Sequence, residues 1–564
     1  MRSRAPLAEV RSWPEGIRRR YRSLGLWTTE TFAGFIEDRT ARFADRLAAV
    51  GTDSLGAQHH WTYAELARRA RGAAVRFQEI GVAPGDRVVV ALPNVVEYLE
   101  AVLGLFRLGA LPVFALPTHR EAELTQFCTL ADAAAIVVAR DPGDADQTAL
   151  LHTVADRVAA HGVLPPLVVD VSDWSRGPGS VSPAGLPLPA HDAEDVAFLQ
   201  VSGGTTGVPK LIPRTHADYL YSVRESARIC GLDTSTVQLV VLPAAHNFAM
   251  SSPGILGVLH AGGTVVLARD PSPRTAFRLI EAEGVTHTAL VPPLAQAWVS
   301  AARRRAPDLG SLGVVQVGGA RLADSVAPQL EEVLGVRLQQ VFGMAEGLVN
   351  YTRADDPVHL VHTTQGRPIS AEDEIRVVDA DDRDVADGEE GALLTRGPYT
   401  IRGYYRDPRA DADCFTADGY YRTGDRVRRL PSGHLVVTGR DKDQINRAGE
   451  KVAVDELESV AVAHADVLDA VAVGVPDDYL GERIVLVVRT EPGRPRPANL
   501  LDHLRASGLA TFKIPDEVVH LDELPVTAVG KNSRRDLRRL LSAHLAADRG
   551  DPSRSAVTAA TPSS

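Results

Sequence analysis

The sequence predicts an α/β fold: a large N-terminal domain of mainly parallel sheets with flanking helices, followed by a small α+β C-terminal domain. Short apolar runs such as RVVVALP, VQLVVLP and GTVVLA alternate with longer amphipathic segments over most of the chain. The runs are rich in Val and Leu and are bounded by Gly, Pro or Asp, which is typical of strands buried on both faces of a parallel sheet. The intervening segments, such as TYAELARRARGAAVRFQEIG, have helical periodicity and end at glycine. This alternation indicates the α/β class.

The chain has 564 residues, which is too long for one hydrophobic core, so we expect several domains. After about residue 376 the pattern changes to alternating strands and turns, and from about residue 444 a compact unit of helices and strands follows. Residues 141–189 are rich in Pro and Gly, have weak periodicity, and are predicted to be a surface excursion. The predicted division is an N-terminal domain at 1–439, a hinge at 440–443, a C-terminal domain at 444–546 and a disordered tail at 547–564.

Composition and charge exclude several classes of function. The net charge is −11 and the arginines are interspersed with acids, which argues against a nucleic-acid surface. Cys128, Cys230 and Cys414 lie too far apart for a disulfide framework or a metal site. The N-terminus lacks the apolar core of a signal peptide, and the most apolar stretch, 102–117, is short and contains Arg107. We therefore expect a cytoplasmic protein that binds neither nucleic acid nor membrane.

Lysine is rare in this chain, so the positions that keep it are informative. Lys and Arg together number 61, and the five lysines are Lys210, Lys442, Lys451, Lys513 and Lys531. A biased genome composition explains the scarcity but not the positions. A lysine retained in such a chain is a candidate for a role that needs a compact, mobile ammonium.

A Gly/Ser/Thr-rich loop in the run LQVSGGTTGVPKLIPRTH, at 199–216, is the strongest single motif. Its glycines let backbone N–H groups converge on an anion, and its hydroxyls and lysine add donors and a positive charge. The spacing differs from that of a Walker A loop. A strand-like lead-in and the rare lysine favour phosphate binding over a flexible loop with no ligand. The candidate phosphate ligands are Ser202, Gly203, Gly204, Thr205, Thr206 and Lys210.

This loop resembles the phosphate loop of the adenylate-forming superfamily, which includes acyl-CoA synthetases, luciferases and the adenylation domains of peptide synthetases. The other motifs that resemble the family follow in order: GGARL (318–322), QVFGMAEGLVNYT (340–352), YYRTGD (420–425), GRDKDQINRAGEKV (439–452) and PVTAVGK (525–531). Ordered motifs are very specific, and the resemblance covers essentially the whole chain except the tail. It implies that the protein uses ATP and Mg²⁺.

The resemblance implies a role for each motif. The adenine-binding segments contribute Gly319, Ala320, Arg321, Val341, Phe342, Gly343, Met344 and Ala345. Asp425 would accept hydrogen bonds from both ribose hydroxyls, because a carboxylate is an acceptor only, and Arg440 would reach the ribose or a phosphate. Glu346, a hard oxygen ligand, and Thr206 would bind magnesium.

Lys531 resembles the catalytic lysine of the family. It would lie between the substrate carboxylate and the α-phosphate of ATP, where attack builds charge on phosphorus. A well-placed donor is worth on the order of 3–4 kcal/mol in such a transition state. Glu346 and Lys451 complete the candidate catalytic residues.

Family members form an acyl-adenylate and then rotate a small, mobile C-terminal domain to present a different face for thioester formation. Lys442 resembles the hinge residue, and a hinge needs only a few residues that absorb the dihedral change. Gly449 and Lys451 resemble residues of the loop that enters the site in the second state. Gly449 would let a phosphopantetheine arm pass close to the backbone.

Within the superfamily, residues 242–267 resemble the stand-alone aryl acid AMP ligases of siderophore and aryl-capped peptide assembly. In that branch Asn247 would bind the substrate carboxylate and its ortho hydroxyl, because an amide both donates and accepts hydrogen bonds. Enzymes that activate amino acids place an aspartate near this region for the substrate ammonium. The asparagine here disfavours an α-amino acid and suits a neutral aryl acid.

The remaining candidate pocket residues do not agree on one acid. Ser252 resembles the 2,3-dihydroxybenzoate enzymes, whereas Phe248 resembles the salicylate enzymes. A site that hydrogen-bonds a hydroxyl discriminates more strongly than an apolar wall. We therefore favour 2,3-dihydroxybenzoate, with salicylate close behind and 3-hydroxypicolinate or another heteroaryl acid as an alternative. The candidate substrate-binding residues are His246, Asn247, Phe248, Ser252, Gly318, Val341 and Val349.

The sequence thus predicts an ATP- and Mg²⁺-dependent aryl acid AMP ligase that releases pyrophosphate and passes the acyl group to a phosphopantetheine thiol. No carrier-like DSL motif follows the C-terminal domain, so a separate aryl carrier protein is the expected acceptor. An aryl-CoA ligase is one alternative. A non-catalytic nucleotide-binding scaffold is another, and the retention of Lys531, Asp425 and Glu346 argues against it.

Overall fold

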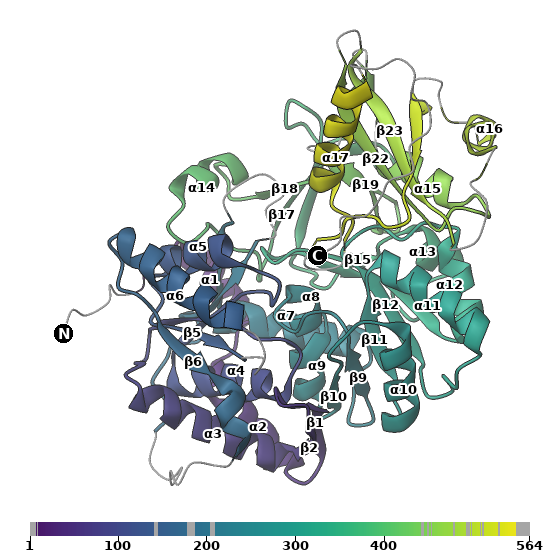
Figure 1. The fold of residues 1–564 in the computed structure, drawn as a ribbon. Helices are drawn as coiled ribbons and strands as arrows, with labels where there is room; N and C mark the ends of the chain where they lie inside the picture. The colour runs from purple at the N-terminus through teal and green to yellow at the C-terminus, as the bar shows by residue number, and fades with distance from the viewer. Residues whose placement is uncertain are drawn as a thin grey trace.

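The predicted fold class is confirmed: two large, mainly parallel sheets with helices around them make up most of the molecule, and a smaller domain follows (Figure 1). The computed structural model describes residues 7, 10–139, 145–176, 187–202, 209–440, 445–447, 450–452, 454–477, 480–491, 497, 499–507, 509, 513–527 and 531–548.

The larger sheet has nine strands. Its order is β15 (Arg367–Pro368), β14 (Val349–Tyr351), β13 (Arg337–Gly343), β12 (Val314–Gly318), β11 (His287–Leu290), β9 (Val237–Val240), β10 (Thr264–Leu267), β1 (Leu47–Thr52) and β2 (Gln58–Thr62). All pairs from β13 across to β1 are parallel, and β2, β14 and β15 add antiparallel edges. The apolar runs of the sequence form these central strands.

The second sheet has six strands. Its order is β6 (Leu167–Asp170), β5 (Ala135–Val138), β3 (Arg87–Ala91), β4 (Leu111–Phe114), β7 (Val196–Val201) and β8 (Leu211–Thr215). Only the β7–β8 pair is antiparallel. The helices of this part of the chain are α1 (Glu15–Ser23), α2 (Phe32–Phe43), α3 (Tyr63–Glu79), α4 (Val96–Leu108), α5 (Glu121–Ala131), α6 (Ala145–Ala160), the 3₁₀ helix η1 (Val171–Arg176), α7 (His216–Ile229), α8 (Asn247–Ser251), α9 (Gly254–Ala261), α10 (Pro273–Glu283), α11 (Pro292–Arg305), α12 (Val326–Leu334), α13 (Val358–Thr363) and α14 (Pro408–Cys414).

The prediction that 141–189 is a surface excursion is wrong for much of that segment. Helix α6 buries Leu151, Val154 and Val158 against α5, and β6 extends the six-stranded sheet beside β5. The periodicity is weak because β6 is an edge strand with two exposed residues, so its sequence lacks the pattern of a fully buried strand.

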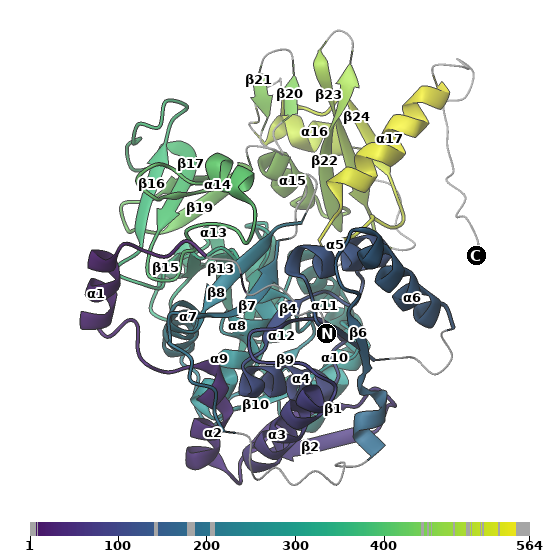
Figure 2. The same ribbon diagram turned by 90° about the vertical axis from the view of Figure 1, so that its left-hand side faces the viewer.

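The change of pattern near residue 376 marks a third, antiparallel sheet. It consists of β16 (Glu374–Val378), β17 (Glu390–Arg396), β18 (Tyr421–Arg429) and β19 (Leu435–Arg440). The C-terminal elements are β20 (Ile445–Arg447), β21 (Glu450–Val452), α15 (Val454–Val462), β22 (Asp469–Asp477), β23 (Gly481–Arg489), α16 (Leu500–Ala506), β24 (Glu517–His520) and α17 (Arg534–Asp548). Figure 2 shows this part beside the antiparallel sheet, where α15 contacts β19. Helix α17 ends two residues inside the predicted tail, whose remainder lies outside the described residues.

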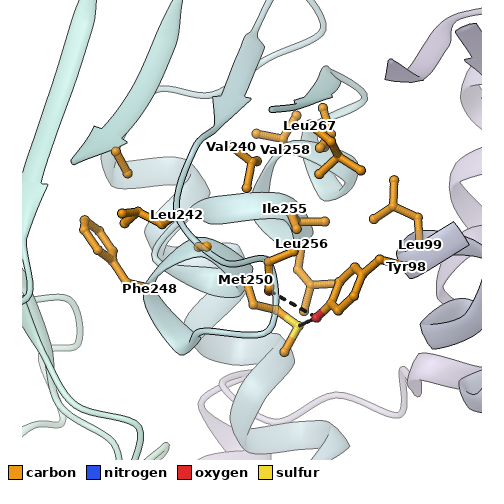
Figure 3. Close-up of a cluster of buried hydrophobic side chains, with 14 of the residues drawn as sticks. Tyr98, Leu99, Val240, Leu242, Phe248, Met250, Ile255, Leu256, Val258 and Leu267 are labelled. Carbon is orange, nitrogen blue, oxygen red and sulfur yellow. Dashed lines mark hydrogen bonds between the residues drawn. The ribbon is translucent and has the colours of Figure 1, made fainter. Parts of the chain in front are cut away.

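Two side chains, one just before α4 and one in its first turn, fix the loop after β9. The Asn94 amide donates to the carbonyl oxygens of Val240 and Leu242 at 3.2 and 2.9 Å and accepts from the Ala244 amide at 2.8 Å. The Tyr98 hydroxyl donates to the Ala244 carbonyl at 3.1 Å and lies 3.6 Å from the Met250 sulfur (Figure 3). The six-stranded half of the molecule thereby positions α8, which carries the predicted acyl pocket.

The crossing of α3 and α4 gives a test of this packing. A carbon added at Gly104 would lie 2.6 Å from Cβ of Ala73, whereas one added at Gly72 meets no heavy atom within 4 Å. Gly104→Ala should lower the free energy of unfolding by about 1–3 kcal/mol through overpacking. Gly72→Ala, the matched helical control, should raise it by up to about 1 kcal/mol. Urea unfolding of both variants measures this, and equal shifts would contradict the packing.

Candidate active site

An ion pair between a buried aspartate and a half-exposed arginine forms one side of the site. Asp425 on β18 is opposite Arg440 on β19, and the Arg440 Nε donates to Asp425 Oδ1 at 2.6 Å. Asp425 is 3% exposed, and the Arg440 side chain is 52% exposed. Burial raises the pKa of Asp425, Arg440 and Lys531 lower it, and the charge of Glu346 raises it. Four charged residues predicted from four separate motifs therefore interact at this point.

Lys531 extends from the C-terminal domain into the same place. A carbon added at Gly319 would lie 3.0 Å from Lys531 Cε and 3.5 Å from Nζ, so the lysine lies directly over the glycine backbone. Burial and the charge of Arg440 lower the pKa of Lys531 to about 8, and Asp425 acts in the opposite direction. Burial and the charge of Lys531 lower the pKa of His246 to about 3, so its imidazole is neutral. Lys531 thus faces Asp425 and Arg440 on one side and His246 on the other.

Glu346 and Lys210 both contact Tyr404, which the sequence analysis did not predict as a site residue. The Tyr404 hydroxyl donates to Glu346 Oε1 at 2.9 Å and lies 3.1 Å from the Tyr421 hydroxyl. The Lys210 ammonium is 4.7 Å from the centroid of the Tyr404 ring and donates to the Cys414 sulfur at 3.5 Å. The Lys210 amide also bonds to the Ser202 hydroxyl at 3.0 Å, which closes the base of the phosphate loop.

The donor set at Glu346 fits magnesium bound to a nucleotide. No group of three metal-ligating side chains occurs within the described ranges, and Glu346 is a single, 9% exposed carboxylate. Magnesium commonly binds one or two carboxylates and takes its other ligands from water and substrate phosphates. A nucleotide at the phosphate loop would supply those oxygens.

The segment after β13 is held by Arg214 on β8. Its guanidinium, 1% exposed, donates to the carbonyl oxygens of Ala345 and Tyr399 at 2.7 and 2.9 Å and to Asp218 at 3.1 Å. The side chains of Phe342 and Met344 pack against apolar residues of the antiparallel sheet. Both side chains are partly buried.

The glycine-rich segment after β12 is also held in place by an arginine side chain. Gly319 and Ala320 leave the strand, and Arg321 donates to Asp324 at 3.0 Å and to the Val437 carbonyl at 3.2 Å. Arg321 therefore ties this segment to β19, beside the Asp425–Arg440 pair.

The predicted acyl pocket lies on the other side of Lys531. Asn247 begins α8, and its Oδ1 accepts a hydrogen bond from the Tyr219 hydroxyl at 2.7 Å. This bond occupies the amide oxygen and leaves the amide N–H groups to face a ligand. The ring tip of Phe248 and Cβ of Val341 each lie 3.1 Å from the position of a carbon added at Gly318.

Several of the residues predicted for the pocket lie close together in the structure. Gly318 is the partner of Val341 in the sheet, Val349 is opposite Gly343, and Ser252 ends α8 with 4% exposure. Tyr219 was missed because its contact with Asn247 spans two helices. Its only signal was an aromatic residue in the helix that follows the phosphate loop.

Several predicted site residues cannot be placed. Gly203, Gly204, Thr205, Thr206, Lys442 and Gly449 lie outside the described residues. Lys451 is in β21, where its backbone pairs with Asn446, but its side chain is not described. Their roles remain predictions.

Comparison with known proteins defines the class. The family described as AMP-binding enzyme matches residues 36–405, and the AMP-binding enzyme C-terminal domain matches residues 456–531. The chain belongs to the AMP-binding enzyme family, whose members use ATP. None of the described helices is long and apolar enough to cross a membrane.

The chain is similar over nearly its full length to proteins named as aryl acid AMP ligases. The chain is 50% identical to the 2,3-dihydroxybenzoate-AMP ligase of Bacillus subtilis (strain 168), over 95% of this chain and 98% of that protein. It is 43% identical to the salicyl-AMP ligase / salicyl-S-ArCP synthetase of Mycobacterium tuberculosis, over 92% of each chain. The apo structure of Mycobacterium smegmatis MbtA superimposes with a TM-score of 0.70 at 43% identity, covering 94% of this chain and 98% of that one. The predicted resemblance to aryl acid AMP ligases is confirmed.

The ion pair at Asp425 gives a binding test. Asp425→Ala should weaken ATP binding by about tenfold or more, because the ribose would lose a charged acceptor. Arg440 is half-exposed, so losing its partner leaves no fully buried charge. Asp384, which pairs with Arg376 at 2.9 Å on the same sheet, provides the matched control. Calorimetric titration with ATP should distinguish Asp425→Ala from Asp384→Ala; equal affinities would remove Asp425 from the nucleotide site.

Proposed function

We propose that the protein activates an ortho-hydroxy aryl carboxylic acid with ATP, forming an aryl-adenylate and pyrophosphate. The observation that supports this most strongly is the position of Lys531 between the Asp425–Arg440 pair and the pocket formed around His246 and Asn247. The relatives named for 2,3-dihydroxybenzoate and salicylate support the same class of substrate.

The chemistry follows from the charges of the site. A carboxylate oxygen of the acid attacks the α-phosphorus, a new P–O bond forms, and the bond to pyrophosphate breaks. The Lys531 ammonium lies where it can attract the carboxylate and stabilise the charge that develops on the α-phosphate. Magnesium bound by Glu346, with Thr206 as a second predicted ligand, would neutralise charge on the phosphates.

Asn247 and His246 suit an aryl acid. The Tyr219 bond fixes the Asn247 amide so that its N–H groups can donate to the carboxylate and the ortho hydroxyl. Since His246 is neutral, the positive charge next to it is that of Lys531. The Ser252 hydroxyl favours 2,3-dihydroxybenzoate, because it can bond to a second ring hydroxyl. The apolar Phe248 favours salicylate, which is the next candidate.

For the second half reaction we propose transfer to the phosphopantetheine thiol of a separate aryl carrier protein, in siderophore or aryl-capped nonribosomal peptide biosynthesis in the cytoplasm. Free coenzyme A is the alternative acceptor. Measuring thioester formation with each thiol separates the two.

The first half reaction is tested by ATP–pyrophosphate exchange with benzoate, salicylate, 2,3-dihydroxybenzoate, 3-hydroxypicolinate and several amino acids. Exchange confined to one or two ortho-hydroxy acids is the expected result. Exchange with amino acids alone, or with no acid, would overturn the proposal.

The pKa of Lys531 predicts a pH dependence. The ammonium is the active form, so kcat/KM for adenylation should fall about tenfold per pH unit above about pH 8, where the amine loses its proton. Lys531→Ala should bind ATP but show no exchange at any pH. A profile that stays flat to about pH 9.5, or exchange by Lys531→Ala, would contradict the assigned role.

The predicted loop residue Gly449 can be tested separately. Gly449→Leu should slow thioester formation at least about tenfold, because the side chain would obstruct the thiol arm, while exchange stays within about twofold. Single-turnover assays of both half reactions give the comparison. Equal losses in the two reactions would reject the assignment.

A further inference from the structure

Tyr351 faces the acyl pocket from β14. It pairs with Val341 on β13, and Val341 in turn pairs with Gly318 on β12. Partners in a sheet project to the same face, as do residues two apart on one strand. Tyr351 therefore shares a face with Val341, Gly318 and Val349, which are three of the predicted pocket residues.

Three buried hydroxyls meet at this face. Tyr351 and Ser226 have no measurable exposure, and Ser252 is 4% exposed. Burial raises the pKa of Tyr351, whereas the nearby hydroxyls of Ser226 and Ser252 lower it. Within the described part of the chain, neither the Tyr351 hydroxyl nor the Ser226 hydroxyl makes a hydrogen bond of normal geometry.

The neighbouring positions of β12 and β13 are also polar, and their amide nitrogens have partners, although the Gln316 amide oxygen has none within the described residues. The Gln316 amide nitrogen donates to Gln339 at 2.9 Å and to the Cys230 sulfur at 3.4 Å, and Gln339 donates to the Thr352 carbonyl at 2.9 Å. The amide nitrogens of the two glutamines thus donate to protein acceptors. The hydroxyls of Tyr351 and Ser226 have no such partner within the described residues.

Unpartnered hydroxyls next to an apolar wall call for an explanation. A buried polar group without a partner is costly, and a phenylalanine would fill the position of Tyr351 without that cost. Each hydroxyl donates one hydrogen bond and can accept others, so a short chain of hydroxyls can present either a donor or an acceptor at its end. Ser252, the residue after α8, is the member of the chain that was predicted for the pocket, and its amide donates to the Phe248 carbonyl at 3.4 Å.

We propose that Tyr351 is a positioning residue that, together with Ser226, holds the Ser252 hydroxyl toward a second ring hydroxyl next to the ortho hydroxyl of the aryl acid. This inference rests on the proposed function and makes it more specific. It assigns the selection of a 2,3-dihydroxylated ring over a 2-hydroxylated ring to a chain of three side chains.

The test is ATP–pyrophosphate exchange by Tyr351→Phe with 2,3-dihydroxybenzoate and with salicylate. We expect kcat/KM for 2,3-dihydroxybenzoate to fall about tenfold, mainly through KM, and kcat/KM for salicylate to stay within about twofold. Ser252→Ala should lose the same preference, and the double variant should lose no more than Ser252→Ala alone. Ser252→Ala and Ser226→Ala keep the test possible if Tyr351→Phe does not fold.

Tyr399 provides a matched control. It is a fully buried tyrosine whose hydroxyl donates to Asp373 at 2.6 Å and accepts from the Val349 amide at 3.3 Å, outside the hydroxyl chain. Tyr399→Phe should alter exchange with both acids alike.

Three results would overturn the inference. If the wild-type enzyme activates both acids and Tyr351→Phe keeps their ratio, Tyr351 has no role in selection and the proposed function stands. If the wild-type enzyme activates salicylate alone, the hydroxyl chain does not receive a second hydroxyl. If the wild-type enzyme activates no aryl acid, the proposed function fails and the inference fails with it.

Discussion

The site depends on the burial of one guanidinium. Arg214 lies on β8, the strand that follows the predicted phosphate loop. The N–H groups of its guanidinium donate to the Ala345 and Tyr399 carbonyls and to the Asp218 carboxylate. Its charge also lies 4.7 Å from the ring of Tyr219, whose hydroxyl holds Asn247. A buried cation is tolerated only when its donors are satisfied. The predicted adenine-binding segment and the predicted acyl pocket therefore keep a fixed position relative to β8, the strand that follows the predicted phosphate loop.

Lys531 completes this arrangement from the other domain. It crosses Gly319, where the absence of a side chain leaves room for the lysine stem. A bulky, planar guanidinium would fit this narrow approach less well than a compact ammonium, which is a physical reason for a lysine in a chain that otherwise uses arginine. Burial and the charge of Arg440 lower the pKa of Lys531, and the charge of Asp425 raises it. Chemistry thus depends on the docking of the C-terminal domain.

Much of the fold and part of the site could be predicted from local pattern. Buried parallel strands have continuous apolar runs, so β3, β9 and β10 were visible in the sequence, and Asp425, Glu346 and Lys531 belong to short motifs. The bonds from Tyr219 to Asn247, from Tyr404 to Glu346 and from Arg214 to Tyr399 join residues 28 to 185 positions apart, and no local pattern contains them. Tyr351 was within a recognised motif, but only the strand register shows that it faces the pocket. Edge strand β6 was missed because its exposed residues break the buried pattern.

Arg214 holds the two halves of the site in one geometry, and the most direct test of this role is the affinity of Arg214→Lys for a non-hydrolysable aryl-adenylate analogue. Lysine keeps the charge beside Asp218 but lacks the fork that spans the Ala345 and Tyr399 carbonyls. Calorimetry should show the analogue bound at least about tenfold more weakly, with ATP alone affected less, because only the analogue occupies both halves. An unchanged affinity for the analogue in a folded variant would show that Arg214 does not hold the two halves of the site together.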